Sequence, residues 1–250
     1  MFLKEFKPVK HGGKKLLYAL LLVDLYMTGD GENSFNHIAN HLSTSDPVMA
    51  ELIKSIGECT LAKAENYYLS LLASIINQQL SGSAADSIHR RLTQEAGGEL
   101  NPRNIFILSP EQFRRAGVSR SKEDFIRRLS AVFSEDVGFL NDIDQKTDDE
   151  ILSILTGLKG IGPWTAHMFM IFSLNRLDVL PIGDAGFRRA VSKFYLNGAR
   201  AEDPEIIKIA EKWRPYRSIA VWYLWRGIDG APKGPIQRSP ASLDGFAEDL

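Results

Sequence analysis

The chain has very little cysteine: Cys59 is the single thiol among 250 residues. One cysteine cannot close an intramolecular disulfide and cannot supply the four thiolates of an iron–sulfur cluster. Histidine is also scarce, and of the five residues only His37 and His41 lie four apart on a predicted helix. Because no third ligand lies near them, a plain surface helix is favoured over a metal site. We therefore expect no disulfide and no iron–sulfur cofactor.

Neither sign of charge dominates, because 30 basic residues balance 31 acidic ones and leave a formal net charge of −1. A nucleic-acid partner would therefore need a local basic patch. Long apolar runs are missing as well. The run at 16–23, LLYALLLV, follows several lysines as in a signal peptide, but Asp24 ends it and no small-residue cleavage site follows. It is too short to cross a bilayer, so we interpret it as a buried helix and expect no membrane partner.

Helical periodicity dominates the rest of the chain, and alternating strand patterns are scarce. Turn signals rich in Gly, Pro, Asn and Ser separate the periodic segments. The sequence therefore predicts an all-α protein built from many short helices. Apolar residues recur three and four apart in 48–56, 65–80, 82–92, 121–133, 149–158, 163–174, 185–196 and 205–228.

We expect three regions along the chain. Residues 1–45 form a helical extension, and residues 46–230 form the main domain. That domain begins where Ser45 or Asp46 can cap a helix that has Pro47 in its first turn. Residues 231–250 are rich in Pro, Gly and Ser, a composition typical of a loosely packed tail.

A sharp turn separates two helices in LKGIGPWTAHMF, residues 158–169. Gly160 and Gly162 permit positive φ and the close approach of another backbone, and Ile161 can anchor the turn in the core. Pro163 suits the first position of the next helix, whose free N–H groups can bind a phosphate without a net positive protein. A helix corner with no ligand is equally compatible with this pattern.

A second feature follows in LPIGDAGFRRA, where Asp184 stands at the start of an amphipathic helix. Asp is a favoured N-cap, and in isolation the pattern favours a cap with no other role. The two roles are compatible, however. A carboxylate held at a helix N-terminus stays ionised, which suits a reaction that develops positive charge.

The ordered set of motifs resembles the helix–hairpin–helix DNA glycosylases. LKGIGPWTA precedes LPIGDAGFRRA by about twenty residues, and segments 71–92, 116–133 and 213–227 complete the set over residues 46–228. The similarity is greatest to the 3-methyladenine DNA glycosylase II group, and it implies two helical subdomains that flank a base-binding cleft. Some members carry an N-terminal β-rich domain, for which residues 1–45 are too short.

The resemblance implies a role for each part of the site. Asp184 would stabilise positive charge on the deoxyribose and position a water molecule. A flipped base leaves a gap in the duplex, which a wedge residue fills. The other implied groups are the wedge (Gln79, Leu80), the base pocket (Trp164, Met168, Trp222, Trp225), the phosphate-binding hairpin (Gly160, Ile161, Gly162, Thr165) and the backbone of Leu158 and Ile161 for a monovalent cation.

Trp164 occupies the position that a nucleophilic lysine takes in bifunctional relatives, and Lys159 lies on the other side of the turn. The resemblance therefore implies hydrolysis by water, without strand cleavage, on double-stranded DNA that carries a damaged base. Basic residues at 103–128 are candidates for phosphate contacts. We expect a monomer in the cytoplasm, or in the nucleus of a eukaryote. A glycosylase for deaminated or mismatched bases and a non-catalytic DNA-binding module are the alternatives.

Overall fold

The computed structural model describes residues 36–78, 80, 82–136 and 138–229. Within these residues every regular element is a helix, so the prediction of an all-α protein is confirmed. The apolar run at 16–23 and the tail at 231–250 lie outside the described residues. None of the described helices has the length and hydrophobicity needed to cross a membrane.

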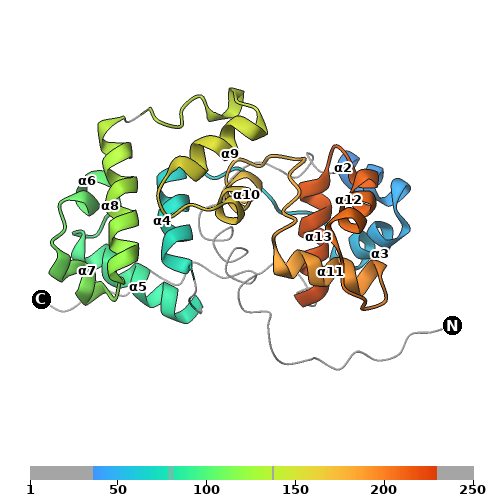
Figure 1. Ribbon diagram of the computed structural model, residues 1–250, viewed down its shortest axis with the longest axis horizontal. Helices are drawn as coiled ribbons and strands as arrows, with labels where there is room; N and C mark the ends of the chain where they lie inside the picture. The colour runs from blue at the N-terminus through green and yellow to red at the C-terminus, as the bar shows by residue number, and fades with distance from the viewer. Residues whose placement is uncertain (1–35, 79, 81, 137, 230–250) are drawn as a thin grey trace, which may run out of the picture.

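The helices form two groups, with α10 (Pro163–Phe172) between them in Figure 1. The first group packs around α8, which contacts α4, α6 and α7. It consists of α4 (Tyr67–Asn77), α5 (Gly82–Glu95), α6 (Pro102–Phe106), α7 (Pro110–Ala116) and α8 (Arg120–Glu135). Helix α9 (Asp148–Gly157) packs against α10.

The second group combines the two ends of the described chain. Helix α13 packs against both α11 and α3, and α2 packs against α3. The expected domain boundary near residue 46 therefore falls between two helices that contact each other. The group consists of α2 (Asn36–Ser45), α3 (Pro47–Ile56), α11 (Ala185–Tyr195), α12 (Asp203–Ala210), the 3-10 helix η2 (Glu211–Trp213) and α13 (Arg217–Asp229).

A buried carboxylate fastens the second group. Asp46 is the N-cap of α3, where its Oδ1 accepts a hydrogen bond from the Val48 N–H at 3.0 Å. Its other oxygen accepts from the Trp213 indole and the Tyr195 hydroxyl, each at 3.0 Å. Asp46 is fully buried, so these donors offset the cost of removing its charge from water. The contacts join α3 to the C-terminal end of α11 and to η2.

The structure corrects the single helix predicted for 205–228. Helix α12 ends at Ala210, η2 follows, and α13 begins only at Arg217. Pro215 explains the break, because proline lacks the N–H that a helix interior needs. The Asp178 carboxylate accepts hydrogen bonds from both Arg214 and Arg217 at 2.7 Å, which ties this break to the segment that leads to Asp184.

Candidate active site

Asp184 caps α11, as the sequence predicts. Its backbone is extended (φ −80°, ψ 120°), and its Oδ1 accepts a hydrogen bond from the Phe187 N–H at 2.6 Å. The turn before it is closed by the Asp184 N–H, which donates to the Pro181 carbonyl at 2.9 Å. Asp184 is only 5 % exposed. Its hydrogen bond to the first turn of α11 fixes the position of the carboxylate.

Two tryptophan side chains complete the surroundings of this carboxylate. The Trp164 indole donates to Oδ2 at 2.8 Å, and the Trp225 indole donates to Oδ1 at 2.9 Å. With the Phe187 amide, three N–H groups therefore point at one buried carboxylate. Hydrogen bonds to an ionised acceptor are stronger than neutral ones, so this arrangement holds the anion in one orientation.

Trp164 and Trp225 differ in how much of each side chain is exposed. Trp164 is the second residue of the helix after the hairpin and is 41 % exposed, so part of its side chain faces solvent beside Asp184. Trp225 is fully buried, and its ring stacks on Phe172 with centroids 5.4 Å apart. The resemblance implies Trp225 as part of the base pocket; in the structure Phe172 covers one face of its ring, and its indole N–H holds Asp184.

The other two residues expected in the base pocket are also buried. Met168 is 5 % exposed and Trp222 is 2 % exposed. The Trp222 indole nitrogen has no hydrogen-bond partner within the described part of the chain, and the Arg226 guanidinium lies 5.1 Å from the Trp222 ring centroid. Of the four expected pocket residues, the structure brings Trp164 and Trp225 directly to Asp184.

The hairpin has one glycine in the left-handed region rather than two. Gly160 has φ +95°, whereas Gly162 is extended, with φ −93° and ψ 173°, and is the N-cap of α10. A Cβ on Gly160 would lie 2.4 Å from the Phe125 ring, but one on Gly162 would meet no atom within 4 Å. Ile161 is 4 % exposed and anchors the turn in the core as predicted. Thr165, also expected in the hairpin, is 5 % exposed.

The segment expected to act as the wedge is attached to this hairpin. The Gln78 side-chain amide donates to the Gly160 carbonyl at 2.8 Å. Lys122 of α8 donates to the carbonyls of Ile76 at 2.8 Å and Gln78 at 2.7 Å, at the C-terminal end of α4. Leu80 is half-buried against the core, and Gln79 lies outside the described residues. Helix α8 therefore supports both the hairpin and the segment that leads to Leu80.

Sequence reasoning missed Gln78 and Lys122. The available signal for Gln78 is that NQQLSG carries two consecutive glutamines, of which only the second is implied as a wedge. Lys122 is one of the seven basic residues at 103–128, a segment that the sequence predicts only as a source of phosphate contacts. Burial lowers the pKa of its ammonium, and its carbonyl contacts give it a structural role.

Most of the basic residues in that segment form ion pairs or hydrogen bonds with other residues of the protein. Arg115 pairs with Glu95 at 2.6 Å, Arg127 with Glu123 at 2.9 Å and Arg128 with Asp124 at 3.1 Å. Arg114 pairs with Glu111. With Lys122, five of the seven basic residues have protein partners, so the segment offers less charge to a ligand than its composition indicates.

The histidine pair is a surface feature, as the sequence favoured. His37 and His41 pack edge-on against Tyr216, and His41 Nε2 lies 3.0 Å from the Arg214 carbonyl. Among the described residues, no three His, Cys, Asp or Glu side chains gather as metal ligands would.

Comparison with known proteins gives this arrangement its family. Residues 72–215 match the model of the HhH-GPD superfamily base excision DNA repair proteins, a span that includes the hairpin and Asp184. The chain belongs to this superfamily. Its HhH-GPD domain is accordingly the part that carries the Asp184 carboxylate, the Trp164 contact and the glycine turn.

Curated relatives and solved structures that resemble this chain are DNA glycosylases as well. The chain is 30% identical to a DNA-3-methyladenine glycosylase of Saccharomyces cerevisiae, over 78% of this chain and 80% of that protein. It superimposes on a DNA-3-methyladenine glycosidase of Bacillus halodurans with TM-score 0.70 and 34% identity, over 81% of this chain and 93% of that one. A Schizosaccharomyces pombe 3-methyladenine DNA glycosylase in complex with abasic DNA gives TM-score 0.69 and 28% identity, over 78% of this chain and 98% of that one.

Proposed function

We propose that this chain is a monofunctional DNA glycosylase that removes alkylated bases from double-stranded DNA by hydrolysis of the N-glycosidic bond. The observation that carries the proposal is the buried Asp184 carboxylate, which three N–H groups hold beside the exposed ring of Trp164. A cap alone would need only the Phe187 contact. The names of the curated relatives, which are glycosylases for 3-methyladenine, support the same activity.

The geometry suits a reaction in which positive charge develops on the sugar. As the base leaves, the deoxyribose takes on oxocarbenium character, and a fixed anion nearby lowers the energy of that transition state. The three N–H donors keep Asp184 in place before the reaction, so little reorganisation is needed when the charge appears. The same carboxylate can orient the water molecule whose oxygen bonds to the sugar carbon as the N-glycosidic bond breaks, and it can accept the proton that this water loses.

Hydrolysis by water is favoured over attack by a lysine. Trp164 has no nucleophilic amine, and its indole N–H already contacts Asp184. Lys159, the nearest lysine along the hairpin, forms an ion pair with Asp124 of α8 at 2.8 Å. The product is therefore an abasic site in an unbroken strand.

The substrate preference follows from the exposed aromatic ring. Trp164 presents part of its ring next to the reacting carboxylate, and an aromatic face attracts a cation with about 0.5–2 kcal/mol. Alkylation of a purine at N3 or N7 gives the base a positive charge. A cationic, weakly bonded base is therefore favoured over a neutral one.

The hairpin is the part of the site that can bind the phosphate backbone of DNA. Gly160 forms the left-handed turn, and the first N–H groups of α10, which have no acceptor within the helix, are donors that a phosphate can accept from. The backbone carbonyls of Leu158 and Ile161 are neutral oxygen ligands of the kind that a monovalent cation takes. The Leu158 carbonyl also accepts the Ile161 N–H at 3.0 Å, which leaves it a second lone pair.

Base release tests the proposal. Duplexes that carry 3-methyladenine, 7-methylguanine, hypoxanthine or uracil are incubated with the full chain, and the free base and intact abasic strand are measured. We expect release of the two alkylated bases. Release of uracil or hypoxanthine alone would support the alternative of a glycosylase for deaminated bases. Binding to all duplexes without any release would support a non-catalytic DNA-binding module.

A further inference from the structure

Arg217, the first residue of α13, forms a forked ion pair with Asp178. Its Nε donates to Oδ1 at 2.7 Å, and its Nη2 donates to Oδ2 at 2.9 Å. Nη2 also donates to the Asp178 carbonyl at 2.7 Å, so both the side chain and the backbone of Asp178 are held. The two side chains are only 15 % and 25 % exposed, so solvent screens the pair less than a surface pair. A bidentate contact of this kind fixes orientation as well as distance.

Ser218, the next residue of α13, holds the two neighbours of Asp178. The Ser218 N–H donates to the Leu177 carbonyl at 2.9 Å, and the Ser218 hydroxyl accepts a hydrogen bond from the Val179 N–H at 2.9 Å. Ser218 is 1 % exposed, so water does not compete for these bonds. Three consecutive residues that precede Asp184 are therefore attached to the first turn of α13.

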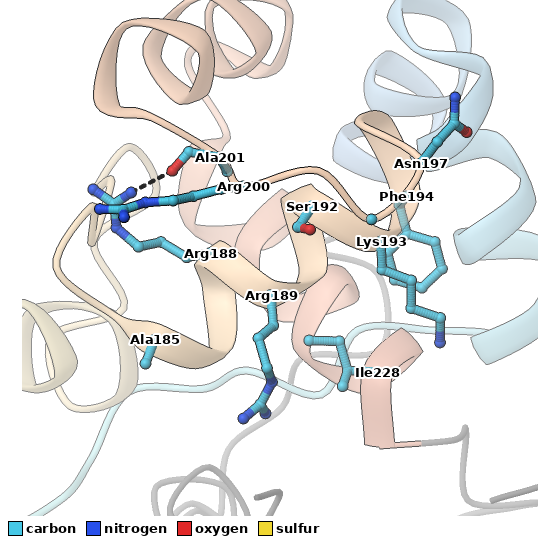
Figure 2. A pocket seen from close by; sticks show the side chains of 11 residues that line it. Ala185, Arg188, Arg189, Ser192, Lys193, Phe194, Asn197, Arg200, Ala201 and Ile228 are labelled. Atoms are coloured by element: carbon cyan, nitrogen blue, oxygen red, sulfur yellow. Dashed lines mark hydrogen bonds between the residues drawn. The ribbon is translucent and has the colours of Figure 1, made fainter. Parts of the chain in front are cut away.

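The turn between that attachment and Asp184 is held by α11. Arg188 donates from Nε to the Ile182 carbonyl at 2.9 Å and from Nη1 to the Ala201 carbonyl at 2.5 Å, a bond that Figure 2 shows. The Asp184 N–H closes the turn on the Pro181 carbonyl at 2.9 Å. The segment that leads to Asp184 is therefore fixed to α13 at its start and to α11 at its end.

Helix α13 contacts Asp184 a second time, through Trp225. Trp225 lies eight residues after Arg217, or about 12 Å along the helix axis. The buried side chains that α11 packs near α13, among them Phe187 and Val191, are apolar, and apolar packing has no preferred direction. The directional contacts at the first turn of α13 therefore determine where along this helix Trp225 meets Asp184.

We propose that Arg217 is a positioning residue for base release, an inference that rests on the proposed function. By holding Asp178, Arg217 keeps α13 aligned with the turn that ends at Asp184. This alignment places the Trp225 indole nitrogen 2.9 Å from the carboxylate. Without the forked contact, the carboxylate and its donor can shift relative to each other, and a displacement of about 1 Å can slow a reaction about 100-fold.

A purely structural role is the competing explanation, because an ion pair of this kind also stabilises the fold. Arg176 provides a matched comparison, since it lies two residues before Asp178 on the same segment. It pairs with Asp148 at 2.7 Å and donates to two nearby backbone carbonyls. Asp148 is the first residue of α9, so Arg176 attaches the segment to α9 and has no contact with α13 among its printed partners.

The test compares Arg217→Gln with Arg176→Gln. Each variant loses one positive charge, one ion pair and its bonds to backbone carbonyls, so both should unfold at a lower urea concentration than the natural chain. In single-turnover reactions with saturating 7-methylguanine duplex, Arg217→Gln should slow base release by about 10- to 100-fold, and Arg176→Gln by less than about twofold. Affinity for an abasic-analogue duplex should not change in either variant. If Arg217→Gln does not fold, Arg217→Lys and Arg176→Lys replace the pair, because lysine keeps the charge but cannot form the fork.

A double-mutant cycle shows whether Arg217 acts through Trp225. Trp225→Phe removes the donor that Arg217 is proposed to place. In that background Arg217→Gln should slow release by less than about threefold, because two changes to one arrangement do not add. Arg176→Gln should have the same small effect in both backgrounds. Losses from Arg217→Gln and Trp225→Phe that multiply in full would show that Arg217 does not act through this contact.

The proposal is overturned by unchanged base release in the Arg217 variant, by an equal loss in the Arg176 variant, or by a loss of DNA affinity in place of rate. Base release by the natural chain separates this inference from the proposed function. If the natural chain releases alkylated bases and the Arg217 variant matches its control, only the role of Arg217 fails. If the natural chain releases no base from any duplex, the proposed function fails, and the role of Arg217 fails with it.

Discussion

The indole nitrogen of Trp225 donates a hydrogen bond to Oδ1 of Asp184 at 2.9 Å. The two residues are 41 positions apart, and the contact joins α13 to the first turn of α11. Because Trp225 is fully buried and stacks on Phe172, it acts on the reaction by positioning Asp184.

Trp225→Phe should keep the ring stacked on Phe172 and remove only the donor. A hydrogen bond to a charged group is worth about 1.5–3 kcal/mol, so single-turnover base release should fall by about 10- to 150-fold. The loss should be the same for cationic 7-methylguanine and neutral hypoxanthine, and affinity for an abasic-analogue duplex should not change. A loss confined to the cationic base would assign Trp225 to the base pocket.

Gly160 and Gly162 form a matched pair for testing the hairpin. Gly160→Ala forces an alanine to φ +95° and places its Cβ 2.4 Å from Phe125, so it should lower the free energy of unfolding by about 1–3 kcal/mol and weaken binding to damaged and undamaged duplexes alike. Gly162→Ala has open space and an ordinary φ, so its stability should remain that of the natural chain. Urea unfolding and a binding titration measure both effects. Equal stability of the two variants would contradict this account of the turn.

The contact between Gln78 and Gly160 should couple the wedge segment to the hairpin. Gln78→Ala removes the amide that donates to the Gly160 carbonyl, while Lys122 still holds the end of α4. Because the wedge and the hairpin are then less well aligned, base release should slow more for a normally paired lesion than for the same lesion opposite a mismatch, which costs less to unpair. Fluorescence of 2-aminopurine beside the lesion reports flipping directly. An equal effect on both duplexes would argue against the coupling.

Stability should fall on mild acidification. Burial lowers the pKa of His167, and of His89 against the opposing effect of Asp86, below the usual value of 6.5. As pH falls through 6.5, the histidines of the unfolded chain therefore bind protons before those of the folded chain do. The free energy of unfolding then decreases until the pH reaches the folded-state pKa values. Urea unfolding at pH 7.5 and pH 5.5 measures this loss, and His167→Gln should reduce it. A variant with the same loss would exclude His167 as a cause.

Local features of the sequence predicted much of the fold. Helix periods, the Asp46 and Asp184 caps and the Pro163 helix start depend on residues within one or two turns. Contacts between distant segments could not be read in this way. Gln78 and Gly160 are 82 positions apart, and the resemblance gave Trp225 a place in the site without showing that Phe172 covers its ring.

The break around Pro215 could be predicted only in part from the sequence. Proline predicts that a helix ends, but the apolar period continues on both sides of it. The link from Asp178 to Arg214 and Arg217, which fixes the direction of the chain there, is a tertiary contact.

Base release by Asp184→Asn under single-turnover conditions tests the central claim most directly. Asparagine still caps a helix, but it has one oxygen for three N–H donors, so the free energy of unfolding should fall by about 1–3 kcal/mol while the variant remains folded. The variant should bind an abasic-analogue duplex and release 3-methyladenine and 7-methylguanine no faster than the uncatalysed rate. Release at a rate close to that of the natural chain, from a variant shown to be folded, would contradict the assignment of Asp184 as the catalytic residue.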